Sequence, residues 1–203
     1  MKTYNRSYLI ITILLLVIAP ASAERSPSRF KSGQYENLKL AIDESGHLTG
    51  FYHEEQGDGV VKSCSFYLAG LVDGDKSTVV TWSNKAFTGK LKANRDSVTL
   101  QIENGLDHLG CGLVLMPEIK SGLDLERDSL SELLELRKVS SPRVHFHEKA
   151  DAKSELKSYL VDGNIVGVMV RKGDWIEVEY QGVKRTTKGW IPVSSTEALT
   201  PPK

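Results

Sequence analysis

The chain has 203 residues, and its 26 basic and 26 acidic side chains give a formal net charge of zero. Such a chain has no basic excess to attract a polyanion, so nucleic-acid binding is excluded from the expected functions. The length and ordinary composition suit one or two compact domains.

Residues 1–23 have the pattern of a secretory signal peptide. The charged start carries Lys2 and Arg6, and an apolar run follows over residues 8–18. This run is shorter than the roughly 20 residues that a membrane-spanning helix needs, and an Ala-Ser-Ala triplet ending at Ala23 supplies a cleavage pattern. We therefore expect cleavage after Ala23, a periplasmic or secreted location and a mature form free of the membrane. The alternative is an uncleaved membrane anchor.

After a flexible segment over residues 24–33, residues 34–139 are expected to form the first domain. Apolar and polar side chains alternate along it with the period of half-buried strands. Short strands separated by turn residues favour an all-β fold, an antiparallel meander that closes into a barrel or packs as a sandwich. The expected strands cover residues 38–42, 48–52, 60–71, 78–83, 87–93, 98–103 and 111–116.

The two cysteines, Cys64 and Cys111, are expected to form a disulfide. In an oxidising compartment an even pair of cysteines is more often a bridge than a catalytic or metal-binding set. Each cysteine falls within an expected strand, so the bridge ties an early strand of the first domain to a late one. Two buried thiols are the alternative.

The stretch SLSELLELRKV, residues 129–139, predicts a short helix at the end of the first domain. Its leucines recur at helical spacing, and Ser129 with Glu132 has the spacing of a capping box. Pro142 then disfavours further helix and marks the domain boundary.

The final segment, residues 141–199, is again rich in expected strands. From Trp175 to Tyr180, core positions alternate with Trp175 and two glutamates. Because successive side chains of a strand point to opposite faces, Trp175 is expected beside the glutamates at the solvent face. The alternative is that Trp175 covers the loop over residues 149–157. Trp190 is expected to pack against the first half of the barrel or against the core.

This segment resembles a bacterial Src-homology-3-like (SH3-like) domain, a small five-stranded barrel. The resemblance rests on RVHFHEKAD, YLVDGNIVGVM, KGDWIEVEY and KGWIP, in that order. In peptide-binding members a tryptophan, a proline and aromatic residues of the opening strand line a groove for extended ligands. The resemblance implies that Trp175 and Pro192 hold two of these places, and that His145 and His147 stand where the tyrosines would be.

No catalytic residue, metal ligand or cofactor is assigned. His145 and His147 share an expected strand face, but zinc sites use more protein ligands than two histidines. Carboxylates gather at residues 53–55 and 124–128 without a nucleophile elbow, a zinc-protease motif or a phosphate-binding loop beside them. The chain is therefore expected not to be an enzyme.

Together these patterns predict a non-catalytic binding protein of the bacterial cell envelope. Its SH3-like module is expected to dock a peptide of the cell wall (peptidoglycan) or an extended segment of an envelope or secreted protein. One alternative is a periplasmic inhibitor or immunity protein against a cell-wall hydrolase or toxin. Another is a barrel that carries a small ligand, since larger barrels enclose cavities.

Overall fold

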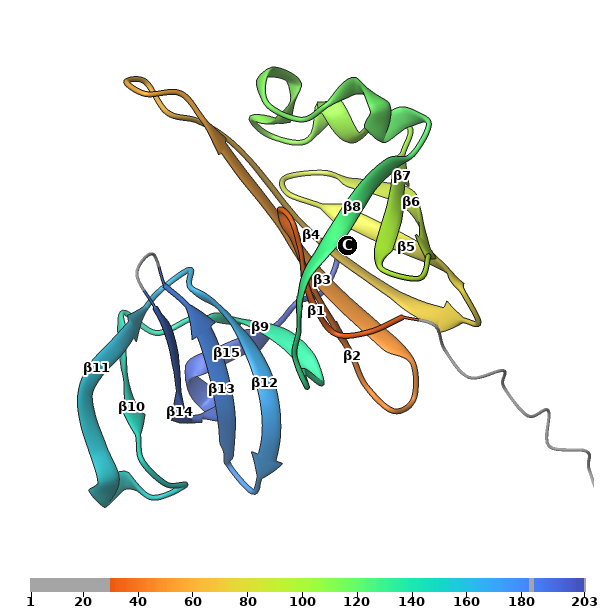
Figure 1. Cartoon of the computed structure of the whole chain (residues 1–203). Helices are drawn as coiled ribbons and strands as arrows, with labels where there is room; N and C mark the ends of the chain where they lie inside the picture. Colours follow the sequence, from red (N-terminus) through yellow and green to blue (C-terminus); the bar gives the residue numbers. More distant parts are fainter. Residues whose placement is uncertain (1–29, 183–184, 203) are drawn as a thin grey trace, which may run out of the picture.

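The structure is a computed structural model that describes residues 30–182 and 185–202. A closed eight-stranded barrel is followed by a seven-stranded sheet (Figure 1). The expected signal peptide over residues 1–23 lies outside the described residues. Within the described ranges, no helix has the length and apolar character needed to cross a membrane.

The barrel is an antiparallel meander in which each strand pairs with the next along the chain. It closes where β1 pairs with β8. The all-β class and the barrel are therefore confirmed. The strands are β1 Gly33–Tyr35, β2 Leu38–Ile42, β3 His47–Gln56, β4 Lys62–Asp73, β5 Lys76–Trp82, β6 Ala86–Ala93, β7 Ser97–Ile102 and β8 Leu123–Leu130.

The barrel begins earlier than the sequence predicts. Phe30 is only 4% exposed and belongs to the barrel core. The hydroxyl of Ser32 donates a hydrogen bond to the carbonyl of Leu133 at 2.8 Å. Residues 30–33, which the sequence assigns to the end of a flexible segment over 24–33, thus contact the barrel core and the link that follows β8.

Large side chains fill the interior of the barrel. The rings of Tyr52 and Phe66 stack with centroids 4.9 Å apart. At Gly50 in β3, an added Cβ would lie 2.8 Å from the side chain of Leu68 and 2.9 Å from that of Leu40. Because cores are packed to crystal-like density, glycine here makes room for the two leucines.

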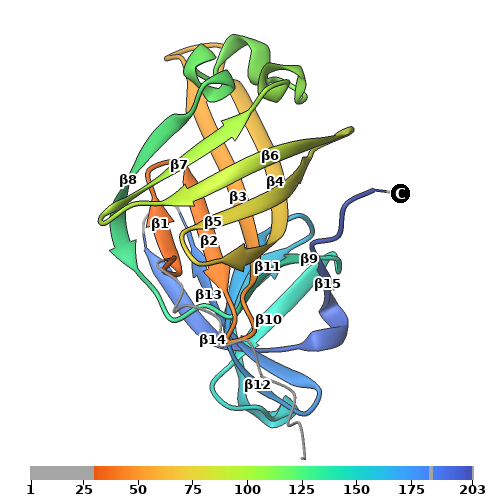
Figure 2. The same ribbon diagram turned by 90° about the vertical axis from the view of Figure 1, so that its right-hand side faces the viewer.

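A cap of short 3₁₀ helices closes the barrel end that lies away from the second sheet (Figure 2). These are η1 Gly105–Asp107, η2 Cys111–Leu113 and η3 Pro117–Lys120. The strand predicted over residues 111–116 is wrong. Gly110 has φ 81°, which turns the chain before Cys111, and burial of Cys111, Val114 and Leu115 follows helical spacing rather than alternation.

The helix predicted over residues 129–139 is also wrong. Strand β8 continues to Leu130, a short link follows, and β9 Glu135–Val139 joins the second sheet. Leu133 and Leu136 are each 1% exposed and pack between the barrel and this sheet. A two-turn helix is marginal by itself, so tertiary burial of these leucines decides the local structure.

The second sheet has the strand order β11-β10-β14-β13-β12-β9-β15. Its first strand along the chain, β9, begins at Glu135, within the last residues that the sequence assigns to the first domain. Its own core includes Phe146, Val166, Ile176 and Ile191. Its remaining strands are β10 Arg143–His147, β11 Glu155–Val161, β12 Ile165–Lys172, β13 Trp175–Gln181, β14 Thr186–Pro192 and β15 Thr196–Ala198, with η4 Ala152–Ser154 and η5 Val193–Ser195 as short 3₁₀ turns.

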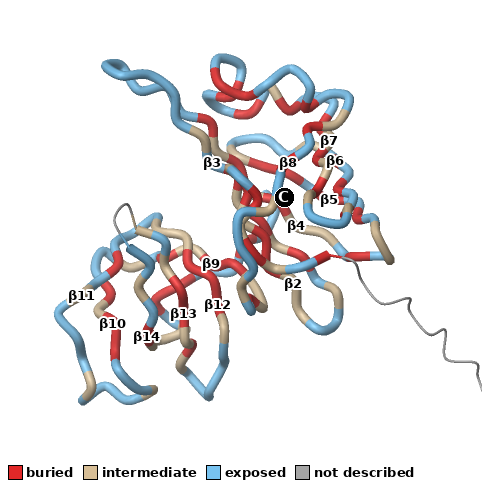
Figure 3. The backbone as a smooth tube through the Cα atoms, in the orientation of Figure 1, coloured by how far each residue is buried: buried red, intermediate tan, exposed pale blue. Residues whose placement is uncertain are grey.

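The barrel and the second sheet meet through a small apolar cluster. Figure 3 shows buried segments, drawn in red, in both β-structures. Trp82 from the barrel packs there and is 6% exposed. The hydroxyl oxygen of Thr49 accepts the backbone N–H of Leu136 at 2.8 Å. These contacts join the two β-structures across one interface. The other buried members of the cluster are Ala41, Leu133 and Leu199.

Candidate functional site

Strands β10, β13 and β14 bring together three of the four residues predicted to bind a ligand. Trp175, the first residue of β13, is paired with Pro192, the last residue of β14. Strand β10 pairs with β14 through His147 and Trp190. The antiparallel register therefore places Trp175, Pro192 and His147 in one small region.

Trp175 packs directly on His147. The two rings meet edge to face, with centroids 4.8 Å apart and an interplanar angle of 76°. The indole is half-buried and His147 is only 7% exposed. The tryptophan predicted at the solvent face thus keeps part of its ring accessible, while the rest covers the imidazole.

The Nδ1 atom of His147 is buried and has no hydrogen-bond partner among the described residues. Leaving such an atom unpaired disfavours the folded state by roughly 1–3 kcal/mol. Buried polar atoms in native proteins nearly always have a partner, so an exception calls for an explanation. Because Nδ1 is buried, a ligand group could reach it only if the covering ring of Trp175 moved.

His145 has different neighbours from His147, although the two are separated by one residue. The β10–β11 register shifts between them. Nδ1 of His145 donates to the carbonyl of Leu156 at 3.0 Å, and its ring lies 5.7 Å from that of Tyr159. The two histidines therefore do not form the paired site that simple alternation predicts.

Tyr159 and Arg143 lie beside His145 and extend the surface formed by the predicted binding residues. The sequence analysis singles out neither of them. Tyr159 is 46% exposed, and the guanidinium of Arg143 lies 4.3 Å from its ring centroid. Their strands β10 and β11 stand at one edge of the sheet. The signal was present in ELKSYLV, where Tyr159 alternates with the buried Leu160.

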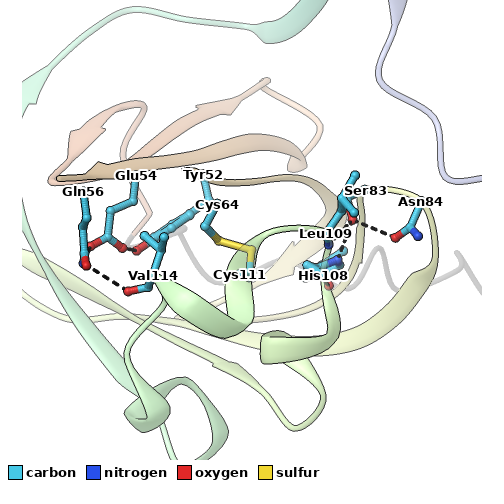
Figure 4. The surroundings of a disulfide bond; sticks show 11 residues. Tyr52, Glu54, Gln56, Cys64, Ser83, Asn84, His108, Leu109, Cys111 and Val114 are labelled. Carbon is cyan, nitrogen blue, oxygen red and sulfur yellow. Dashed lines mark hydrogen bonds between the residues drawn. A yellow bond between two sulfur atoms is a disulfide. The ribbon is translucent and has the colours of Figure 1, made fainter. Parts of the chain in front are cut away.

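A single buried histidine, His108, lies beneath the barrel cap. His108 is 2% exposed and stacks on Phe66 at 4.6 Å, while its Nε2 lies 3.0 Å from the hydroxyl of Thr81. Burial lowers the pKa of His108 to about 4. Its Nδ1 lies 3.3 Å from the hydroxyl of Ser83, and that oxygen also accepts the N–H of Leu109 at 3.1 Å (Figure 4). These bonds hold the cap on the barrel.

The carboxylate clusters noted in the sequence serve local structure. The Tyr52 hydroxyl donates to Glu54 at 2.6 Å, and Asp124 accepts a hydrogen bond from Thr99. Residues 30–182 and 185–202 contain no group of three or more histidine, cysteine or acidic side chains that could hold a metal ion.

Comparison with protein-family models, curated proteins and solved structures gives no match. The SH3-like resemblance of residues 141–199 accordingly stays a prediction. The roles proposed below are argued from the geometry of these residues alone.

Proposed function

We propose that the protein is a non-catalytic binding protein of the bacterial cell envelope. Its second sheet docks an extended peptide, either from the cell wall or from a partner protein, across His147, Trp175 and Pro192. The observation that carries this proposal is the partly exposed ring of Trp175, which packs edge to face on His147 and stands beside Pro192 in the β13–β14 register.

The surrounding surface supports an extended ligand. An aromatic ring beside a proline offers a rigid apolar platform, which loses little side-chain entropy on binding. Arg143 and Tyr159 continue the surface along the sheet edge, where a longer peptide gains a cationic and an aromatic contact. The disulfide between Cys64 and Cys111 supports an oxidising compartment.

The barrel itself is not proposed as the site of a small ligand. Its interior holds buried aromatic and aliphatic side chains, including Tyr35, Tyr52 and Phe66. Such packing occupies the space in which wider barrels enclose a ligand.

Retention on purified peptidoglycan tests the proposal. Trp175→Ala should lower retention by at least about tenfold, whereas Trp175→Phe should keep most of it, since a buried aromatic anchor dominates such interfaces. Val80→Ala, a change at an exposed barrel position, serves as the control. Binding to envelope-protein extract but not to bare peptidoglycan would assign the ligand to a protein segment. Equal retention of Trp175→Ala and the wild type on both materials would reject this surface.

A further inference from the structure

Exposed apolar side chains gather at the barrel end that lies away from the second sheet. The hairpin between β3 and β4 projects beyond the barrel beside the cap (Figures 1 and 3). Val60 in its turn is 86% exposed, and Leu109 and Leu113 of the cap are 69% and 70% exposed. These are the three most exposed large apolar residues of the described chain. Together with Val61 of the same turn and Met116 of the cap, these residues are called the barrel tip.

The barrel tip is held rigid from beneath. The disulfide joins Cys64 at the base of the hairpin to Cys111 in the cap. The side-chain amide of Gln56 donates to the carbonyl of Val114 at 3.2 Å (Figure 4). A free two-stranded hairpin is marginally stable in water, so these links are what keep the hairpin in place. A preorganised surface of this kind loses little entropy when it binds.

Acidic side chains outnumber basic ones in the segments that carry these apolar residues. The barrel tip is built from residues 54–63 and 103–120, and the turn over 83–86 is bonded to the cap through Ser83 and Leu109. These three segments carry six acidic and three basic side chains, a net charge of minus three in a chain whose total is zero. The field at this end therefore attracts a basic partner.

We infer that the barrel tip inserts into an apolar-walled cleft of a basic protein in the same compartment. A narrow projecting hairpin fits a concave site, and clustered exposed apolar side chains mark protein interaction surfaces. The negative field disfavours contact between the barrel tips of two copies of the chain and disfavours anionic lipid, because like charges would then face each other. This surface is separate from the peptide-docking region of the second sheet, so it does not rest on that proposal.

Egg-white lysozyme, a basic cell-wall hydrolase with an open cleft, is the probe, and cytochrome c is a basic control without such a cleft. The protein should bind lysozyme, slow its lysis of cell walls and leave cytochrome c unbound. The double variant Val60→Ser with Val61→Ser should weaken binding by at least about tenfold. The control pair Leu71→Ser and Val80→Ser, exposed elsewhere on the barrel, should change it by less than about twofold.

The charge contribution is tested separately from the apolar one. Asp58→Lys in the hairpin turn should weaken binding, and added salt should weaken wild-type binding more than that of the variant. Retained circular dichroism spectra exclude unfolding as the cause. Absence of lysozyme binding at about 100 µM, where even weak complexes are detected, overturns the inference. Equal binding of both basic proteins, self-association lost in the tip variant, or binding to anionic phosphatidylglycerol vesicles overturns it as well.

Discussion

Lys39 of the barrel strand β2 forms an ion pair with Glu179 of β13, with 3.3 Å between Nζ and Oε1. The two side chains are 13% and 12% exposed, so water screens the pair only weakly. Oε2 of Glu179 lies 3.3 Å from Nζ of Lys188. Glu179 is thus shared between its own sheet and the barrel, and the pair ties the two β-structures together at the border of their apolar contact.

Removing the barrel partner of this pair should loosen the interface. We expect Lys39→Met to lower the free energy of unfolding by about 1–3 kcal/mol, because Glu179 then loses one of two compensating cations in a partly buried position. Lys90→Met, at an exposed position of β6, is the matched control and should change stability by less than about 0.5 kcal/mol. Urea unfolding measures both variants, and indistinguishable midpoints would contradict the role assigned to the pair.

Gly110 lies where the cap meets the hairpin, and replacing it should strongly lower the stability of the fold. Its φ is 81°, and an added Cβ would lie 2.2 Å from the carbonyl oxygen of Ser63. Gly110→Ala should therefore cost more than about 2 kcal/mol, since backbone strain and a clash add. Gly74 has φ 61° but no neighbour within 4 Å of such a Cβ, so Gly74→Ala should cost only about 1 kcal/mol. Thermal unfolding compares the two, and equal losses would show that the Ser63 contact is unimportant.

The disulfide should stabilise the whole barrel as well as the cap. Cys64 and Cys111 are 47 positions apart, and closing a loop of this length in the unfolded chain contributes on the order of 4 kcal/mol. We expect Cys64→Ser with Cys111→Ser to lose most of this amount in urea unfolding. Reductant should shift the wild type toward the variant and leave the variant unchanged. A stability that is insensitive to both treatments would contradict the prediction.

The barrel was predictable because alternation, turn residues and the two cysteines all point to the same fold. In β3 and β4, Tyr52, Phe66 and Leu68 are inward-facing and buried, as a two-residue period predicts. Gly50, which sits between apolar neighbours in LTGFY, lies where two leucines need its space. Local pattern and tertiary packing agree at these positions.

The sequence pattern predicts the wrong element where the same spacing of apolar residues fits both a helix and a strand. Leu133 and Leu136 have helical spacing in the sequence, but they also fit a link and a strand whose leucines pack against the barrel. The apolar run after Cys111 is so short that helical spacing and alternation cannot be told apart in it. Leu133 and Leu136 are buried by residues far away in the sequence, such as Trp82 and Ala41. A pattern read over a few neighbouring residues therefore cannot predict this burial.

The candidate site was predictable only in part. The alternation around Trp175 and the register of β13 with β14 put Trp175 beside Pro192 as the resemblance implies. The register shift between His145 and His147 has no local sequence signal, because it arises in the pairing with β11. The burial of Nδ1 of His147 follows from the ring that covers it.

His108 should make the protein sensitive to acid. Burial lowers its pKa from the ordinary 6.5 to about 4, so between these pH values the unfolded chain binds a proton that the folded chain excludes. The contribution of His108 to the free energy of unfolding is fully present above about pH 6.5. It decreases by on the order of 3 kcal/mol as the pH drops toward 4. His108→Gln should be less stable than the wild type at pH 7, because the stack on Phe66 is lost. The difference between the two should then shrink on acidification. Urea unfolding at several pH values between 7 and 4 measures this difference, and parallel pH profiles would show that folding leaves the proton affinity of His108 unchanged.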